Sequence, residues 1–498
     1  MTSPSPGQST PDPRRWRALG LLAVVQFMLV LDTTVVNVAL PSIQRALHFS
    51  PSDLAWVVNG YTLMAGGFLI LGGRLADLAG RRRLFMSGLA LFAVASAVSG
   101  LAQDSAMLVA ARFAQGLGEA IAAPAALSLA VLMFDDRKER ATAVGIWGGL
   151  AGLGGTAGVI LSGVITSYAS WRWVFLINVP IAAVVLIAAP RMVKESRAAR
   201  RQRIDVTGAL LVTASLVLVV YGLLAAATHP WGAGVVVIPL AAGGALMAAF
   251  IVSQAVIKDP LVPLRFFRNR TRVVANFGTV LLTSSFITMF FVLTLYMQDI
   301  GRYSPVKTGL AYLPFGFALL LGILTSIQVL PKIGVKGGLV VAFLFMSGGL
   351  ALLSLITVHV DYPAHILPGF LIMAFGNGVA FPALNNAALY EVGPSDAGLA
   401  SGVENTFLQL GGSLGLSVLV TLALRHATSR IGHGVSAAVA TTEGYQLALR
   451  VAVGLGVAAA LLIALALQRV TFVPPDQQAL AIAEADALNT ADTPTPAR

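Results

Sequence analysis

Apolar stretches of about 20 residues recur along the whole chain, and short connections between them carry most of the charge. Hydrophobic residues make up 57% of the 498 residues and charged residues only 11%, as in a protein surrounded by lipid. A helix of about 20 residues crosses a hydrocarbon layer, so we predict an all-α membrane protein with about fourteen transmembrane helices. The predicted spans cover residues 17–41, 52–73, 84–103, 107–133, 141–166, 173–190, 205–227, 233–256, 273–298, 309–330, 338–358, 366–389, 397–424 and 445–468.

Lysine and arginine are distributed unevenly between alternate connections. One side of the predicted membrane carries basic clusters such as residues 14–17 and 81–83, whereas the other carries scattered residues such as Arg45 and Arg172. Basic residues stay on the cytoplasmic side of membrane helices. We therefore expect a multi-pass protein of a bacterial cytoplasmic (inner) membrane with both termini inside. Residues 1–16 would form a disordered cytoplasmic tail and residues 471–498 a second cytoplasmic tail.

The same bias explains the net charge of +11, so no nucleic-acid partner is needed to account for it. The chain has no cysteine, which excludes disulfides and thiolate metal sites. Its six histidines fall in predicted outward connections without zinc-like spacing. We expect no metal site and no cofactor.

A pattern of small residues occurs twice and indicates an internal duplication. It comprises Gly145, Gly154, Gly155 and Gly158 near the fifth span and, at a constant offset of 257 residues, Gly402, Gly411, Gly412 and Gly415 near the thirteenth. A duplicated helical membrane protein is typical of two-lobed transporters. The alternative is a chance match between glycines that promote helix packing.

The duplication predicts two six-helix lobes with two further helices inserted between them. The predicted order is an N-terminal lobe at 17–190, a basic cytoplasmic linker at 191–204, two inserted helices at 205–256, a basic cytoplasmic loop at 257–272 and a C-terminal lobe at 273–470.

Asp32 lies about halfway along the first apolar stretch, where an ionised carboxylate is costly unless it is paired, hydrated or protonated. Arg112, Gln115 and Glu119 share one face of the fourth predicted helix. Arg112 and Asp32 fall at similar depth, so we expect them to pair. In the functional interpretation Asp32 alternates between an ionised, paired form and a protonated form, with the proton as coupling ion. The alternative is a permanent structural ion pair.

Two further acidic residues lie within predicted spans. Glu119 is deeper than Arg112, and Glu404 lies about two turns into the thirteenth helix. Either is a candidate for a second proton site or for a counter-charge to a cationic ligand. Hydration near the membrane surface is an equally good explanation for Glu404.

Uncharged polar residues within the spans are candidates for lining a ligand cavity. Most such residues instead bond to neighbouring helices. The candidates are Asn37, Gln115, Asn178, Asn385 and Asn405.

The cytoplasmic connection between the second and third spans has a specific pattern. Gly73 and Gly80 permit a tight turn, and Asp77 and Arg81 are spaced for an i, i+4 interaction. A loop that only sets topology would need the arginines alone.

Segments 31–41, 73–83, 112–118 and 171–180 together strongly resemble motifs of the fourteen-helix drug:proton antiporter branch of the major facilitator superfamily. The resemblance implies the major facilitator fold and proton-driven efflux of lipophilic, often cationic compounds by alternating access. It further implies that Asp32 and Arg112 couple protons to transport. Asp77, Gly80 and Arg81 would belong to a cytoplasmic latch that favours one conformation.

The antiporter motif of the fifth helix is degenerate in this chain. Gly154 and Gly158 match the family pattern, but Val159 stands where the family has a proline and Ser162 where it has a glycine. These departures weaken the bend expected at that helix.

The predicted function is proton-coupled antiport that exports lipophilic drugs or antibiotics, cationic ones in particular. The main alternative is a dedicated exporter of one endogenous metabolite, such as an antibiotic, a lipid or an amino acid. A membrane-embedded enzyme or a channel is a remote alternative, because the chain shows neither a zinc-protease helix nor a filter loop. The expected partners are a small-molecule substrate, protons and the lipid bilayer, and we expect the protein to work as a monomer.

Overall fold

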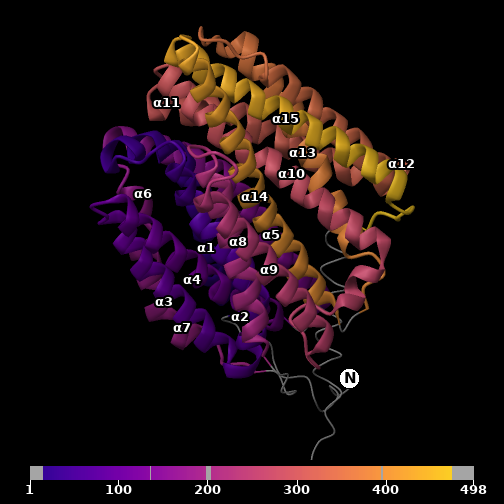
Figure 1. Cartoon of the computed structure of the whole chain (residues 1–498). Helices are drawn as coiled ribbons and strands as arrows, with labels where there is room; N and C mark the ends of the chain where they lie inside the picture. The colour runs from indigo at the N-terminus through magenta and orange to yellow at the C-terminus, as the bar shows by residue number, and fades with distance from the viewer. Residues whose placement is uncertain (1–14, 135, 198–203, 394–395, 474–498) are drawn as a thin grey trace, which may run out of the picture.

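The computed structural model describes residues 15–134, 136–197, 204–393 and 396–473, and within these ranges the chain is helical and contains no strand (Figure 1). The helices of the first half are α1 (Arg15–Leu47), η1 (Asp53–Ala55), α2 (Trp56–Ala79), α3 (Arg81–Gly100), α4 (Ser105–Leu132), α5 (Arg137–Tyr168), α6 (Trp173–Leu176) and α7 (Asn178–Met192). These are followed by α8 (Val206–Ala225) and α9 (Gly234–Val256). The remaining helices are η2 (Leu264–Arg268), α10 (Arg270–Leu295), η3 (Tyr296–Ile300), α11 (Pro305–Ala311), α12 (Leu313–Leu353), η4 (Tyr362–Ile366), α13 (Leu367–Ala388), α14 (Ala397–Gly432) and α15 (Ala437–Ala466).

The predicted tails at 1–16 and 471–498 lie mostly outside the described residues, as does the middle of the predicted linker 191–204. In Figure 1, helices α1, α3, α4 and α7 lie on one side of the molecule, and α12, α13 and α15 lie on the other.

Twelve segments of the described chain are long and apolar enough to cross a membrane. This number differs from the prediction of about fourteen at two places. One is Pro305–Leu353, where α11 and α12 form a single segment of 49 residues. The other is α5, which has 32 residues and is long enough to span a bilayer, and whose apolar stretch among the fully described residues is Ala157–Tyr168.

The 41-residue helix α12 is in fact two antiparallel arms. Gly334 has φ 76° and ψ 158°, which breaks the helical conformation. Gly322 in the first arm lies against the backbone of Phe375, and the Phe345 ring in the second arm lies 5.5 Å from the Phe375 ring. In an unbroken helix Gly322 and Phe345 would be about 35 Å apart, so the chain reverses at Gly334. The two arms correspond to the predicted spans at 309–330 and 338–358.

The glycines that repeat in the sequence make equivalent contacts in the two halves. A Cβ atom at Gly158 of α5 would lie 3.1 Å from the carbonyl oxygen of Leu31 in α1. One at Gly411 of α14 would lie 2.6 Å from the Cα of Val280 in α10. Similarly, α4 packs between α2 and α3, and α13 packs between the two arms of α12. Close helix packing through small residues therefore pairs α1 with α5 and α10 with α14, which favours the predicted duplication.

Helices α8 and α9 pack against each other, and α8 contacts both halves of the chain. Gly67 of α2 lies against the side chain of Thr213 in α8. Towards the other end of α8, Arg425 of α14 donates to the carbonyl oxygen of Ala226 at 2.6 Å. The inserted pair therefore bridges α2 and α14, while the outer face of α9 is largely apolar and exposed.

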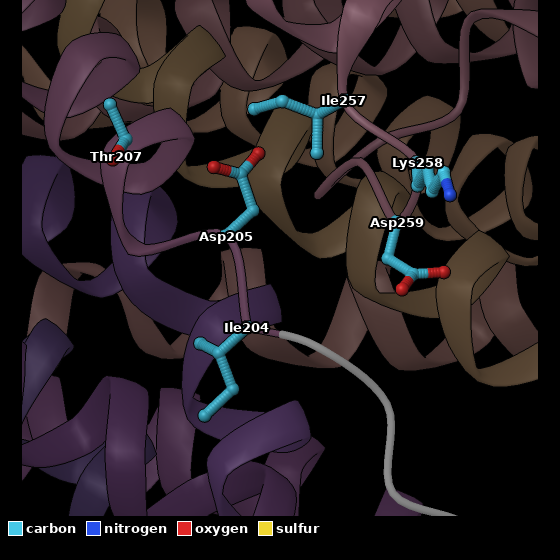
Figure 2. Close-up of a pocket in the computed structure, with 6 residues that line it drawn as sticks. All are labelled: Ile204, Asp205, Thr207, Ile257, Lys258 and Asp259. Atoms are coloured by element: carbon cyan, nitrogen blue, oxygen red, sulfur yellow. The ribbon is translucent and has the colours of Figure 1, made fainter.

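A buried carboxylate holds the inserted pair together at the end where α8 begins. Asp205 caps α8 by accepting from the backbone N–H of Gly208 at 2.7 Å, and its other oxygen accepts from Gln254 of α9 at 2.7 Å and from the N–H of Leu261 at 3.2 Å. From α2, Arg74 donates to the carbonyl oxygens of residues 259–261. Figure 2 shows Asp205 beside a cavity of about 360 Å³ that is lined by Ile204, Asp205, Thr207, Ile257, Lys258 and Asp259.

Hydrogen bonds also join the two halves near one end of the bundle. Gln298 of η3 donates to the carbonyl oxygen of Val38 in α1 at 2.8 Å. The backbone N–H of Val306 in α11 donates to Ser167 Oγ in α5 at 3.0 Å. These residues lie at the helix ends that the charge distribution predicts to face outward.

Candidate functional site

Asp32 lies in the middle of α1, and its side chain is 0% exposed. Its Oδ2 accepts a hydrogen bond from Arg112 Nη1 at 2.6 Å. Its Oδ1 accepts from Asn178 Nδ2 at 2.7 Å and from Gln115 Nε2 at 3.3 Å. The structure thus brings together four of the residues singled out in the sequence. Donors from α4 and α7 offset the cost of burying the carboxylate.

Arg112 is also buried, and its position does not depend on Asp32 alone. Its Nε donates to the carbonyl oxygen of Val57 in α2 at 2.9 Å, and its Nη1 also donates to Gln115 Oε1 at 3.0 Å. The guanidinium carbon lies 4.2 Å from the centre of the Tyr61 ring, within the range of a cation–π interaction. Arg112 therefore has fixed partners on α2 and α4 that would remain if Asp32 lost its charge.

Gln115 connects the pair to α3. Its Nε2 donates to Ser96 Oγ at 2.7 Å, and its Oε1 accepts from Ser99 Oγ at 3.0 Å. These bonds orient the amide so that its N–H group faces Asp32 and its oxygen faces Arg112. The sequence prediction did not include Ser96 and Ser99 in the site, because single serines in apolar helices give no signal of their own.

Glu119 lies one turn beyond Gln115 on α4 and is half-buried. Its Oε2 has no hydrogen-bond partner among the described residues. The carboxylate lies within electrostatic range of Tyr61, Asp32 and Arg112. Of the three residues predicted to share this helical face, Arg112 and Gln115 contact Asp32 directly and Glu119 does not.

Glu404 of α14 is 8% exposed and forms no ion pair within the described part of the chain. Its Oε2 accepts from Asn385 Nδ2 of α13 at 2.7 Å. A buried carboxylate with a single amide partner is under-compensated. Glu404 and Asn385, both candidate site residues from the sequence, thus lie in contact in the second half of the chain.

The remaining polar candidates bond within their own helices. Asn37 is buried, donates to the carbonyl oxygen of Thr33 at 3.3 Å and has an unpaired Oδ1. Asn405 is exposed and donates to the carbonyl oxygen of Ser401 at 3.0 Å.

The turn between α2 and α3 is shorter than the predicted connection at 73–83, because α2 continues through Gly73 to Ala79 and Gly80 alone lies between it and α3. Gly80 adopts φ 112°, a conformation that favours glycine. Arg81 Nη2 lies 2.8 Å from Asp77 Oδ1 across this turn. Gly73 faces Pro124 of α4, and a Cβ atom there would lie 3.6 Å from the proline ring.

Glu195, which follows α7 in the predicted basic linker, is a partner of this turn that sequence reasoning missed. Its Oε1 accepts from the backbone N–H of Arg82 at 3.1 Å, at the start of α3. The N–H of Arg81 donates to the carbonyl oxygen of Ser196 at 2.9 Å. A Cβ atom at Gly80 would lie 2.8 Å from Glu195 Oε1. Part of the linker is thus docked on the turn.

Gly154 and Gly158 of α5 pack on α1 on either side of Asp32, Gly154 near Phe27 and Gly158 near Leu31 and Thr34. A Cβ atom at Gly154 would lie 3.2 Å from the carbonyl oxygen of Phe27. Ser162, which replaces the family's glycine, donates to the carbonyl oxygen of Val35 in α1. Without a proline at position 159, α5 continues as one helix from Arg137 to Tyr168.

Solved structures with the same arrangement of helices belong to transporters. An auto-inhibited POT family peptide transporter gives a TM-score of 0.67 at 16% identity, over 92% of this chain and 99% of that one. A bacterial homologue of the human lysosomal transporter Spinster gives a TM-score of 0.62 at 15% identity, over 92% of this chain and 97% of that one. At these identities the likeness concerns the fold. The fold is that of a multi-pass helical membrane protein.

Sequence comparisons give the family. The model of the Major Facilitator Superfamily matches residues 22–416, and the chain belongs to that family. The lincomycin resistance protein of Streptomyces lincolnensis is 40% identical over 82% of this chain and 84% of its own length. The puromycin resistance protein of Streptomyces alboniger is 37% identical over 89% of this chain and 90% of its own length. The tetracenomycin C resistance and export protein of Streptomyces glaucescens is 34% identical over 84% of this chain and 77% of its own length.

Proposed function

We propose that this protein exports lipophilic drugs or antibiotics, cationic ones in particular, across a bacterial cytoplasmic membrane in exchange for protons. The names of its relatives support antibiotic export. The observation that carries the proposed coupling is the fully buried pair of Asp32 and Arg112 at 2.6 Å. Ionisable groups within membrane helices commonly form the proton pathways of transporters.

Protonation of Asp32 is the proposed coupling step. A proton that binds the carboxylate neutralises it and removes its Coulombic attraction to Arg112. Arg112 keeps the carbonyl oxygen of Val57, the Gln115 amide and the Tyr61 ring, so it stays on α2 and α4. The helix that gains freedom is therefore α1, which also contacts α5 and α10. Because α10 belongs to the other half of the chain, movement of α1 is a route from the proton to the interface between lobes.

In this scheme the lobes at 17–190 and 273–470 rock against each other with both termini cytoplasmic, and one monomer suffices. The ion pair of Asp77 with Arg81 acts as the cytoplasmic latch, supported by its 2.8 Å contact across the turn at Gly80. Docking of Glu195 on the same turn extends the latch into the linker.

Cationic substrates would be favoured by Glu119 and Glu404, two acidic groups within membrane helices that have no basic partner among the described residues. In the part of the chain that the structure describes, one oxygen of Glu119 has no hydrogen-bond partner and Glu404 is bonded to Asn385 alone. Asn37 and Asn405 complete the set of polar groups proposed to meet the substrate. Their amides bond weakly or only within their own helices.

A second candidate function is the dedicated export of one endogenous metabolite. It is favoured by the names of several relatives, each of which refers to a single antibiotic or antibiotic class.

Proteoliposomes with an acidic lumen test the proposal. A panel of cationic and neutral dyes and antibiotics is added outside, and accumulation is compared with and without the pH gradient. Gradient-dependent accumulation of several unrelated cations is expected. Accumulation of one compound alone would favour the dedicated exporter. Equal uptake with and without the pH gradient would refute proton coupling.

A further inference from the structure

One arginine of α15, Arg450, lies on the face that the helix otherwise presents to lipid. The side chain is exposed, and Val457, Leu461 and Leu465 follow it on the same face with exposures of 38%, 58% and 78%. A charge on a lipid-facing surface is stable only where it reaches the polar headgroup layer.

The position of Arg450 along α15 meets this condition. About 24 Å of helix separates it from Ala466, the last residue of α15, and the hydrocarbon layer is about 30 Å thick. If the cytoplasmic boundary lies at Ala466, the Arg450 backbone is about 6 Å short of the opposite boundary, a distance that the long arginine side chain covers. The predicted topology makes this the outer boundary.

Arg450 contributes to a notch between α14 and α15 of about 310 Å³. Arg430 is paired with Glu443 through contacts of 2.6 and 3.2 Å. Arg450 Nη2 donates to Gln446 Oε1 at 3.2 Å and has no carboxylate partner within the described residues. The notch is lined by His426, Arg430, Glu443, Gln446, Leu447 and Arg450.

Charge within the notch is unbalanced. Glu443 offsets one of the two arginines, so an excess positive charge remains beside an apolar surface. Basic pockets between membrane helices are suited to anionic headgroups, and a guanidinium offers several N–H donors in the geometry that phosphate oxygens accept.

We propose that the notch binds the phosphate of an anionic phospholipid headgroup in the outer leaflet. The free N–H groups of Arg450 bind the phosphate oxygens, and Arg430 adds donors that its pair with Glu443 leaves free. Leu447 and the stripe from Val457 to Leu465 provide an apolar path for the acyl chains. A free phosphate would gain nothing from that path, so the lipid is the favoured source of the anion.

The test is native mass spectrometry of the full chain, titrated with phosphatidylglycerol and with phosphatidylcholine of the same acyl chains. Arg450→Gln should weaken binding of phosphatidylglycerol about tenfold and leave phosphatidylcholine unchanged, because it removes a charge-assisted contact. Arg450→Lys should give an intermediate loss, because it keeps the charge but not the planar fork. Arg45→Gln is the matched control, since Arg45 is 62% exposed at the same end and outside the notch.

Equal phosphatidylglycerol binding by Arg450→Gln and the wild type would overturn the proposal, as would an equal loss in Arg45→Gln. Displacement of the lipid by an equal concentration of inorganic phosphate would show a site for free anions and would also overturn it. Thermal unfolding in phosphatidylcholine nanodiscs checks that the variants are folded. An unchanged melting temperature is expected because Arg450 bonds only to Gln446, its neighbour on the same helix.

Discussion

Asn178 donates a hydrogen bond of 2.7 Å to Oδ1 of Asp32, although the two residues are 146 positions apart in the sequence. Asn178 is the first residue of α7, where the short helix α6 ends and the chain starts a new helix. The amide therefore contacts α1 from a different helix than the one that carries Arg112. The carboxylate is held between α4 and α7.

Asn178→Ala should weaken this arrangement without removing the ion pair. A hydrogen bond to a charged group contributes about 1.5–3 kcal/mol, so a lower melting temperature and slower gradient-driven transport are expected. Differential scanning fluorimetry and the proteoliposome assay measure the two effects. Ser87→Ala is the control, because Ser87 of α3 is exposed, lies outside the proposed site and donates to the carbonyl oxygen of Leu84 in its own helix. Equal behaviour of the two variants would argue against a role for the contact.

Glu119→Gln tests the proposed counter-charge. The substitution keeps the size of the side chain and removes its charge, so transport of cationic substrates should fall about tenfold, equivalent to about 1.4 kcal/mol, while neutral substrates are little affected. Initial rates for paired cationic and neutral dyes give the ratio directly. Equal losses for both kinds of substrate would contradict a counter-charge role.

Glu195→Ala should destabilise the turn between α2 and α3. The carboxylate accepts from the first turn of α3 at the N–H of Arg82, and loss of such a cap costs about 1 kcal/mol. Turnover should slow while substrate affinity, measured by equilibrium binding, stays unchanged. Glu195→Gln is the control, because it keeps an acceptor oxygen and should retain most of the stability. A change in affinity without a change in turnover would not fit.

Asp205→Ala should be strongly destabilising, because the buried carboxylate accepts three hydrogen bonds that hold α8, α9 and the following loop together. Loss of the cap and of the buried contacts predicts about 2–4 kcal/mol. Asp259→Ala is the matched control, since that exposed side chain lines the same cavity and should cost less than about 0.5 kcal/mol. Thermal unfolding compares the two variants. Similar melting temperatures would show that the hydrogen bonds of Asp205 contribute little to stability.

The sequence predicted the features that depend on local pattern. Hydropathy located the membrane helices, including both arms of α12, and helical periodicity placed Arg112 and Gln115 on the face that meets Asp32. The i, i+4 spacing of Asp77 and Arg81 predicted a contact that the structure contains.

Features that depend on pairs distant in the sequence were not predictable. Glu195 appeared to be part of a basic linker, and nothing in its neighbourhood indicated that it caps α3. Asp205 and Gln254 are separated by a complete helical hairpin. Arg450 lies within the predicted apolar span at 445–468. The notch that it lines also requires Arg430 of the neighbouring helix, and the sequence alone does not bring the two together.

The most direct measurement of the central claim is transport by Asp32→Asn under an imposed pH gradient. The amide is nearly the same size and cannot take up a proton at this position, so gradient-driven export should be lost while the purified variant still binds substrate. Substrate binding and a measurable unfolding transition check that the loss is not a failure to fold, since an unpaired Arg112 costs about 3–5 kcal/mol. Export by Asp32→Asn at the wild-type rate with undiminished dependence on the gradient would contradict the account.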